Sequence, residues 1–386
     1  MKRVVLLGAS GSIGRQTLDI LLANPQAYAL AAFSVGHRIE KIPDILHAFP
    51  TVHIFCVQRQ EDAEYLQKQF PHCQVLYGEE GLAALARLED YHVLVNALVG
   101  FVGFAPTLAA IQSGHDVALA NKETLVCGGQ LINEALKKYK RKLYPIDSEH
   151  SAIWQCLAGN KKTCVSRLLI TCSGGPFQTY TFAQLQKVKV EEALAHPRWK
   201  MGAKITIDSA NLMNKGFEVI EAHWLFDIPY ERIEVLLHPE SVIHSMVEYV
   251  DHSIIAQLGA ADMHLPIAYA LSYPDRQALP HVESLDLTRI GSLHFAHPDM
   301  DRFPLLALAY EVGKRGGNLA AVLNAANEVC NLAFRQGKIS FTALMGIVRE
   351  TVLKASFEEL HDAEGLYRAD AWGRKMALER MKGKTC

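Results

Sequence analysis

The chain has 386 residues, enough for two or three domains, and its 49% hydrophobic and 21% charged content is ordinary for a globular protein. A formal net charge of −2 excludes a general nucleic-acid-binding protein. The eight cysteines lack Cys-x-x-Cys pairs and zinc-type spacing, so we expect reduced thiols and a cytoplasmic protein. Residues 93–114 carry no Asp, Glu, Lys or Arg, but Asn96, Gly100 and Pro106 favour a strand, a loop and a helix over a membrane span.

The first predicted element is a buried strand at residues 4–7, followed by a glycine loop and a helix at residues 15–22. The loop has the spacing Gly8-x-x-Gly11-x-x-Gly14. Glycines permit close backbone approach, and a helix N-terminus offers free N–H groups to a pyrophosphate. In this strand–loop–helix context, the spacing predicts a dinucleotide site rather than a structural turn.

The second predicted strand, residues 28–35, ends at Gly36-His37-Arg38. NAD-specific sites usually carry an acidic residue here, to hold the ribose 2′-hydroxyl. The planar fork of Arg38 instead suits a 2′-phosphate, so the sequence favours NADP over NAD. An ordinary surface charge is the alternative for Arg38.

Strands and helices then alternate in the pattern of a doubly wound parallel sheet, in which ligands gather beyond the carboxyl ends of the strands. Strands are predicted at residues 53–58, 75–77, 93–99, 116–120 and 142–147, and helices at residues 61–70, 81–88 and 106–113 and from Thr124 to Tyr139. The residues Asn121-Lys122-Glu123 follow one of these carboxyl ends.

Two carboxylates, Asp147 and Glu149, stand one residue apart after the strand at 142–147. In an extended backbone such residues point the same way. Two adjacent negative charges repel each other, and a bound cation would stabilise them. A solvated loop is the alternative. Glu218 is the candidate third carboxylate, and a set of oxygen ligands alone selects Mg²⁺ or Mn²⁺. An exposed helix position is the alternative for Glu218.

The middle of the chain holds candidate anion-binding residues. Ser173 opens a Ser-Gly-Gly turn that offers a hydroxyl and backbone N–H groups, although a plain glycine turn is the better explanation of this motif taken alone. Ser209, Asn214 and Lys215 suit a phosphate, and Lys215 shares a helical face with Glu218 if this segment is helical. Residues 195–202 suit either a mobile lid or a loop pinned by Trp199.

The remaining chain is predicted to contain antiparallel strands between residues 233 and 260, whose open sheet suits a homodimer. Helices are predicted at residues 305–315, 320–335, 341–354 and 369–381. The expected fold class is α/β with a Rossmann-like parallel sheet, an α+β catalytic domain with a largely antiparallel sheet, and a helical bundle. The expected domains are residues 1–147 for NADPH binding, 148–273 for catalysis and dimerisation, 274–304 as a linker and 305–386 as the helical domain.

Taken together, the motifs resemble the 1-deoxy-D-xylulose 5-phosphate reductoisomerase family from one end of the chain to the other. They occur in one order: Gly8-Ala-Ser-Gly-Ser-Ile-Gly14, Ala120-Asn-Lys-Glu123, Asp147-Ser-Glu-His150, Ser173-Gly-Gly-Pro-Phe177, His196-Pro-Arg-Trp199, Met213-Asn-Lys-Gly216, His238-Pro-Glu-Ser-Val-Ile-His-Ser-Met246 and Leu323-Asn-Ala-Ala-Asn-Glu328.

The resemblance implies an NADPH-dependent and divalent-metal-dependent isomerisation and reduction of a sugar phosphate, without nucleic-acid or membrane partners. It implies metal binding by Asp147, Glu149 and Glu218, and catalytic roles for these residues, Lys122 and His196. The implied substrate residues are Lys122, Ser148, Glu149, Ser173, His196, Ser209, Asn214, Lys215 and Glu218, and the implied cofactor residues are Ser10, Gly11, Ser12, Ile13, Gly36, His37, Arg38, Asn121, Glu123 and Gly202. Trp199 and Met201 would belong to a closing loop.

The chain departs from the family pattern at two places. His37-Arg38 replaces the Lys-Asn often found there, which leaves open which side chain meets the 2′-phosphate, and Ala9-Ser10 replaces Ser-Thr but keeps a hydroxyl. Two rival functions remain: a metal-dependent β-hydroxyacid or sugar-phosphate dehydrogenase without rearrangement, and an NADP-sensing protein without turnover. Three acids together with Lys122 and His196 argue against a sensor, which needs no metal centre.

Overall fold

The computed structural model describes residues 1–195, 199 and 201–382. Contacts divide the chain into two compact units. The first contains Met1–Thr124, Ile132–Ser151 and Asp262–Val282, and the second contains Leu125–Leu131, Ala152–Ala261 and Glu283–Cys386. The functional domain boundaries expected at residues 147, 273 and 304 stay predictions.

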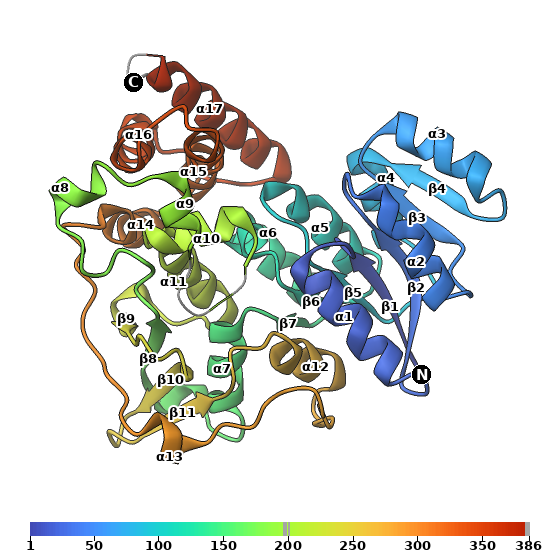
Figure 1. Cartoon of the computed structure of the whole chain (residues 1–386), viewed down its shortest axis with the longest axis horizontal. Helices are drawn as coiled ribbons and strands as arrows, with labels where there is room; N and C mark the ends of the chain where they lie inside the picture. Colours follow the sequence, from blue (N-terminus) through green and yellow to red (C-terminus); the bar gives the residue numbers. More distant parts are fainter. Residues whose placement is uncertain (196–198, 200, 383–386) are drawn as a thin grey trace. The chain divides into compact units, whose positions relative to one another are not determined.

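The first unit is built on a seven-stranded parallel sheet in the order β4-β3-β2-β1-β5-β6-β7 (Figure 1). Its strands are β1 (Lys2–Leu7), β2 (Tyr28–Ser34), β3 (Ile54–Val57), β4 (Gln74–Tyr77), β5 (Val93–Asn96), β6 (Asp116–Leu119) and β7 (Leu143–Pro145). Residues Val4–Leu7 of β1 are completely buried, as a parallel sheet with both faces covered requires. The predicted Rossmann-like fold class is confirmed.

Helices cover this sheet and complete its core. They are α1 (Ser12–Ala23), α2 (Ile42–Ala48), α3 (Gln60–Gln69), α4 (Gly78–Ala86), α5 (Phe104–Gln112), α12 (His264–Ser272), both ends of α6 (Lys122–Tyr139) and the beginning of α7 (Ser148–Leu157), with short 3₁₀ turns at Ile39–Lys41 and Phe101–Gly103. Ile267 and Leu271 of α12 are buried in the same core as Leu21 of α1. A segment more than 200 residues away in sequence therefore belongs to the first unit, which the local periodicity did not indicate.

The strand predicted at residues 93–99 ends early, at Asn96. The side-chain oxygen of Asn96 accepts a hydrogen bond from the backbone N–H of Leu98 at 3.1 Å, and its amide donates to the carbonyl of Gly103 at 2.9 Å. An asparagine that bonds to nearby backbone competes with continued sheet pairing, so the chain turns there.

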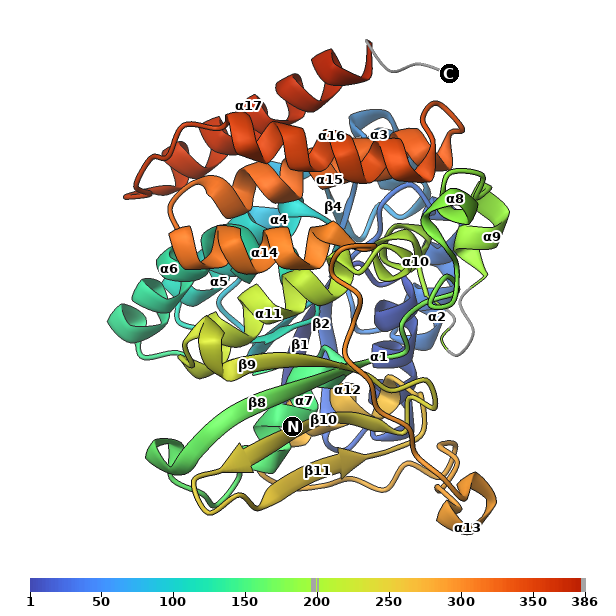
Figure 2. The ribbon, with the colours of Figure 1, turned by 90° about the vertical axis from the view of Figure 1, so that its left-hand side faces the viewer.

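The second unit contains a mixed four-stranded sheet in the order β11-β10-β8-β9 (Figure 2). Its strands are β8 (Val165–Cys172), β9 (Ile233–Leu237), β10 (Ile243–Tyr249) and β11 (Ile254–Leu258). The central strand β10 runs antiparallel to β8 and β11, while β8 and β9 are parallel. This arrangement confirms the expected largely antiparallel sheet.

The rest of the second unit consists of helices and their connecting segments, and the four C-terminal helices lie together in Figures 1 and 2. The helices are α8 (Phe182–Leu185), α9 (Val190–Leu194), α10 (Ala203–Ala210), α11 (Met213–Phe226), α13 (Leu287–Ile290), α14 (Pro304–Arg315), α15 (Leu319–Arg335), α16 (Phe341–Lys354) and α17 (Ala363–Met381), with 3₁₀ turns at Lys162–Cys164 and Tyr230–Arg232. The last helix begins earlier than expected because Asp362 caps it, accepting from the N–H of Gly365 at 2.8 Å.

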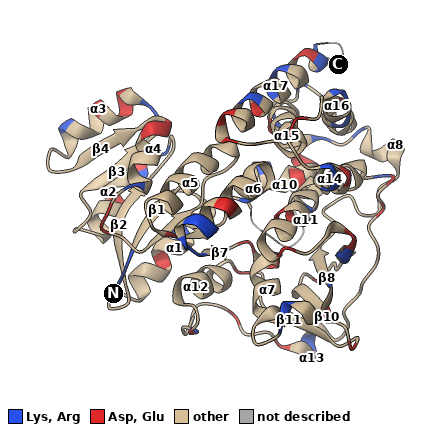
Figure 3. Cartoon of the chain, turned by 180° about the vertical axis from the view of Figure 1, so that it is seen from behind, with Lys and Arg blue, Asp and Glu red and all other residues tan. Residues whose placement is uncertain are grey.

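Charge on α17 is mixed, with basic and acidic segments alternating along the helix (Figure 3). Arg374 lies 2.7 Å from Asp370 on the same helix and 2.5 Å from Glu328 on α15. This ion-pair network joins the two helices. Among the described residues, no helix combines the length and apolar character needed to cross a bilayer.

Candidate active site

The glycine loop after β1 is packed too closely for side chains. Gly8 has a φ of +83°, and a Cβ on Gly14 would lie 2.2 Å from the carbonyl oxygen of Gly8. The N–H of Gly8 donates to the Ser34 hydroxyl at 3.0 Å, which ties the loop to β2. No described side chain caps the N-terminus of α1, where Gly11 is the N-cap. The loop therefore presents glycine backbone and uncapped N–H groups, as a pyrophosphate site requires.

The predicted 2′-phosphate residues follow β2 at the same edge of the sheet. Gly36, His37 and Arg38 are all exposed. Ser10 is buried, while Gly11, Ser12 and Ile13 are half-buried around the loop. The side chains of His37 and Arg38 both remain candidates for the phosphate, because neither is buried in the protein.

Asn121 begins α6 and holds a neighbouring loop through its side chain. Its Oδ1 accepts from the N–H of Thr124 at 3.1 Å, and its Nδ2 donates to the carbonyls of Leu98 and Gly100 at 3.0 and 2.9 Å. The same amide donates to Glu123 at 3.1 Å. These bonds give Asn121 a scaffolding role, and the cofactor contacts expected of Asn121 and Glu123 stay predictions.

Lys122 and Asp147 form an ion pair at the carboxyl edge of the parallel sheet. Lys122 Nζ lies 2.6 Å from Asp147 Oδ2, and the two side chains are only 8% and 11% exposed. The two residues come shortly after β6 and β7, which pair side by side. The topology thus brings a lysine and a carboxylate together from 25 residues apart.

The backbone at Glu149 differs from the one expected. Asp147 was expected to share an extended backbone with Glu149, but α7 begins at Ser148, so Glu149 lies in the first turn of a helix. The extended-strand reason for placing the two carboxylates together is therefore wrong. The Ser148 hydroxyl donates to Glu149 Oε2 at 2.6 Å, and a carboxylate is favourable near the positive end of a helix.

In the second unit, three predicted site residues share one face of α11. Asn214 Nδ2 donates to Glu218 Oε1 at 2.6 Å, and Lys215 pairs with Glu218 Oε2. Lys215 also donates to the carbonyl of Thr171 in β8 at 2.7 Å. Lys215 and Glu218 are 3% and 1% exposed, so the expected helical face is confirmed as a buried polar group rather than a solvated one.

The turn after β8, helix α10 and the segment before α10 carry the remaining candidates of this unit. Ser173 accepts from the N–H of Gly175 at 3.2 Å, and the Ser209 hydroxyl donates to the carbonyl of Ile205 at 2.8 Å. Gly202 is the N-cap of α10. The Trp199 ring lies 5.8 Å from the ring of His244. His196 lies outside the described residues, so its predicted role stays a prediction.

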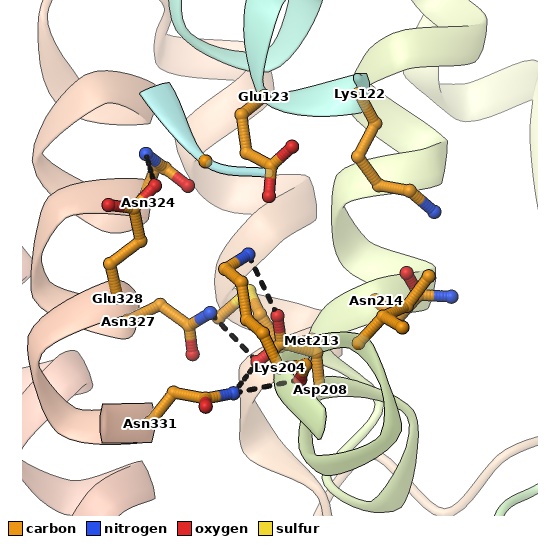
Figure 4. Close-up of polar contacts among 12 residues, drawn as sticks. Lys122, Glu123, Lys204, Asp208, Met213, Asn214, Asn324, Asn327, Glu328 and Asn331 are labelled. Atoms are coloured by element: carbon orange, nitrogen blue, oxygen red, sulfur yellow. Dashed lines mark hydrogen bonds and ion pairs between the residues drawn. The ribbon is translucent and has the colours of Figure 1, made fainter. Parts of the chain in front are cut away.

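A buried polar cluster next to Ser209 was not predicted from the sequence (Figure 4). Asp208 is 2% exposed and accepts from Lys204 at 3.0 Å, Asn327 at 2.9 Å and Asn331 at 2.7 Å. Asn331 also donates to the carbonyl of Lys204 at 2.9 Å. The cluster fixes α10 to α15. The asparagines among the buried apolar residues of α15 were the available signal, because they are unfavourable in a helix interior.

Comparisons with known proteins agree on one family. A family model described as 1-deoxy-D-xylulose 5-phosphate reductoisomerase matches residues 4–129. A model for the C-terminal domain of the same enzyme matches residues 143–226, and one described as DXP reductoisomerase C-terminal domain matches residues 258–376.

Individual relatives match over nearly the whole chain. A Bacillus cereus protein named 1-deoxy-D-xylulose 5-phosphate reductoisomerase 2 is 49% identical over 381 residues, covering 99% of this chain and 100% of the relative. The reductoisomerase of Bacillus subtilis is 52% identical, covering 92% and 93%. The Zymomonas mobilis enzyme, solved with NADPH, has a TM-score of 0.91 at 39% identity, covering 98% and 99%.

A further solved structure, described as DOX-P reductoisomerase in complex with NADPH, fosmidomycin and magnesium, has a TM-score of 0.93 at 38% identity. It covers 99% of this chain and 98% of that one. The likeness therefore extends through both sheets and the C-terminal helices.

Proposed function

The chain belongs to the 1-deoxy-D-xylulose 5-phosphate reductoisomerase family, and we propose how its own residues carry out the family's reaction. The enzyme converts 1-deoxy-D-xylulose 5-phosphate to 2-C-methyl-D-erythritol 4-phosphate for isoprenoid biosynthesis, with NADPH and a divalent cation as cofactors. The observation that carries this function is the 49% identity to a named reductoisomerase over 99% of the chain.

The glycine loop and the end of β2 hold NADPH. The cradle at Gly8 and Gly14 has no room for side chains, and the uncapped end of α1 suits a pyrophosphate. The Arg38 guanidinium supplies positive charge for the 2′-phosphate, and the His37 ring offers a hydrogen-bond donor. Bound NADPH supplies the hydride that reduces the rearranged aldehyde. The full set proposed for this site is Ser10, Gly11, Ser12, Ile13, Gly36, His37, Arg38, Asn121, Glu123 and Gly202.

Asp147, Glu149 and Glu218 hold the divalent cation. The donor set fits Mg²⁺ or Mn²⁺, because every ligand is a carboxylate oxygen. Asp147 pairs with Lys122 and Glu218 with Lys215, so two of the three carboxylates lie beside an ammonium group. The bound cation supplies Lewis acidity to the substrate carbonyl and hydroxyl oxygens.

Lys122 and the residues of α11 bind and orient the substrate. Lys122 adds positive charge where the carbonyl oxygen gains negative charge during cleavage of the carbon–carbon bond. Asn214 and Lys215 lie on one face of α11, and together with Ser173 and Ser209 they hold the phosphate. The phosphate lies away from the reacting carbon atoms, and its binding energy orients the reacting end of the substrate. Ser148, Glu149, His196 and Glu218 complete the proposed substrate site.

The segment around Trp199 and Met201 closes over the bound substrate. Gly202, the N-cap of α10, is where this segment joins a rigid helix. Closure excludes water from the reactive enolate and aldehyde, which would otherwise be lost to side reactions. His196 acts in the same segment.

The enzyme acts as a cytoplasmic homodimer. Strand β11 is one edge of the mixed sheet, and its apolar residues Ile254, Ile255 and Leu258 are 50%, 41% and 37% exposed. An apolar sheet edge of this kind is suited to pairing with a second copy. The seven described cysteines are all free thiols, which suits a reducing compartment.

NADPH oxidation by the purified protein tests the function. We expect absorbance loss with 1-deoxy-D-xylulose 5-phosphate and Mg²⁺, and none after addition of a chelator. Absence of NADPH oxidation in both conditions would reject the function. Isotopically labelled substrate separates the isomerase from a simple dehydrogenase, because only the isomerase moves a carbon atom.

A further inference from the structure

Three side chains of types that bind metal ions lie close together in the first unit, and none of them belongs to the proposed active site. One ring nitrogen from each of His53 and His72 and the sulfur of Cys73 all lie within 4.8 Å of one another. The two histidine rings are 6.1 Å apart in an edge-to-face arrangement. We propose that His53, His72 and Cys73 form a second cation site, which binds a borderline transition-metal ion such as Zn²⁺.

The site lies at the opposite edge of the parallel sheet from the glycine loop. His53 immediately precedes β3, and His72 and Cys73 immediately precede β4, strands that lie side by side in Figure 1. Their pairing brings the two segments together, because Gln74 N–H donates to the carbonyl of His53 at 2.7 Å. NADPH binds beyond the carboxyl ends of the strands, whereas these ligands stand at the amino ends. The second site is therefore independent of the proposed reaction.

The loop that carries His72 and Cys73 is held in place by Gln67 of α3. Gln67 Nε2 donates to the carbonyl of Cys73 at 2.8 Å, and Gln67 Oε1 accepts from the N–H of Val75 at 3.2 Å. The N–H of Cys73 also donates to the carbonyl of Phe70 at 3.0 Å, and the Phe70 ring packs against His72. Gln67 thus holds the backbone where the loop enters β4, and the bond to Phe70 holds the other end, so two of the three ligands start from a fixed backbone.

The donor set selects a different ion from the all-oxygen site. Imidazole nitrogen and thiolate sulfur suit Zn²⁺ and Co²⁺, whereas Mg²⁺ prefers oxygen. Tetrahedral Zn²⁺ with bonds of about 2.0–2.3 Å brings its ligand atoms to roughly 3.3–3.7 Å from one another. The two histidines are exposed and close the remaining distance by side-chain rotation, and water takes the fourth position.

Binding displaces one proton from the protein. Cys73 is 4% exposed, and burial raises the pKa of its thiol, so the free protein carries the neutral form. Coordination forms the metal–sulfur bond and breaks the sulfur–hydrogen bond, and the proton passes to the buffer. Calorimetry in two buffers of different ionisation enthalpy reports this proton.

Cobalt binding to the full-length protein tests the site. Saturating Mg²⁺ is present to occupy the oxygen site, and Co²⁺ is added as a spectroscopic substitute for Zn²⁺. We expect one equivalent of Co²⁺ to give a sulfur-to-cobalt charge-transfer band, which Zn²⁺ then abolishes by displacement. Absence of this band in the wild-type protein would overturn the proposal.

Variants of the exposed histidines identify the ligands without disturbing the core. His53→Ala and His72→Ala should each weaken Co²⁺ binding at least about tenfold, since loss of even a supporting residue costs that much at metal sites. Exposed His47 in the same unit provides the matched control, His47→Ala, which should bind like wild type. Unchanged binding in both His53→Ala and His72→Ala would assign the band to another cysteine and refute the site. NADPH-dependent turnover of each variant verifies that it is folded.

Discussion

Lys122 Nζ and Asp147 Oδ2 lie 2.6 Å apart, in an ion pair almost closed to solvent. The two opposite charges attract each other strongly there, because little water screens them. The same pairing recurs in the second unit between Lys215 and Glu218. Two of the three proposed metal ligands therefore each form an ion pair with a lysine that also belongs to the proposed substrate site.

Replacing Asp147 with Asn should lower kcat/KM at least about 100-fold and raise the Mg²⁺ concentration needed for half-maximal activity. The amide keeps the shape of the side chain but removes the charge that attracts the cation. Asp90→Asn is the matched control, since Asp90 is 80% exposed in an ion pair with Arg3. A Mg²⁺ dependence equal to that of wild type in Asp147→Asn would remove Asp147 from the metal site.

Gly14→Ala should weaken NADPH binding at least about tenfold, or about 1.4 kcal/mol. The added methyl would stand 2.2 Å from the Gly8 carbonyl oxygen and 2.6 Å from Ala9 Cα, so the phosphate loop has to shift. Fluorescence titration with NADPH measures the change. Gly365→Ala, whose nearest new contact is 3.4 Å away, controls for a glycine replaced within a helix. Equal NADPH affinities in the two variants would show that the loop tolerates a side chain.

Asp208→Ala should destabilise the protein by about 3–5 kcal/mol. The change leaves Lys204, Asn327 and Asn331 without the buried carboxylate that all three contact. Urea unfolding measures the loss. Exposed Asp301 gives the control Asp301→Ala, which should change the free energy of unfolding by less than about 0.5 kcal/mol. If both variants unfold at the same urea concentration, the cluster does not hold α10 to α15.

Glu240 should make the stability of the second unit fall in acid. Burial alone would raise the pKa of Glu240, but hydrogen bonds from the His294 side chain and backbone outweigh it and lower the pKa from 4.5 to about 2. A carboxylate with a lowered pKa stabilises the fold above pH 4.5, and this contribution is lost as the pH falls from about 4.5 to about 2.

The difference in free energy of unfolding between wild type and Glu240→Gln isolates this effect from other titrating groups. It should be present at pH 6 and shrink below pH 4.5. Glu283→Gln, at an exposed position, serves as the control and should show no such trend. A difference that is constant from pH 6 to pH 2 would mean that Glu240 gains nothing from His294.

Local patterns predicted most of the fold, because a buried parallel strand and an amphipathic helix each have a distinct period. They could not place α12 in the first core, since that contact joins residues more than 200 positions apart. They also missed that α7 starts at Ser148. Glu149 is therefore positioned by the first turn of a helix and not by an extended strand. The predicted partners Lys215 and Glu218 were recoverable from helical spacing, whereas Asp208 depends on two asparagines from another helix.

The central claim is that Glu218 joins Asp147 and Glu149 on a single cation, and a paired titration of Glu218→Gln tests it most directly. Mn²⁺ binding followed by electron paramagnetic resonance and NADPH binding followed by fluorescence are measured on the same sample. We expect one tightly bound Mn²⁺ per chain in wild type, its loss in Glu218→Gln, and NADPH affinity close to wild type in both. Wild-type Mn²⁺ binding by Glu218→Gln, or an equal loss of Mn²⁺ and NADPH binding, would contradict the claim.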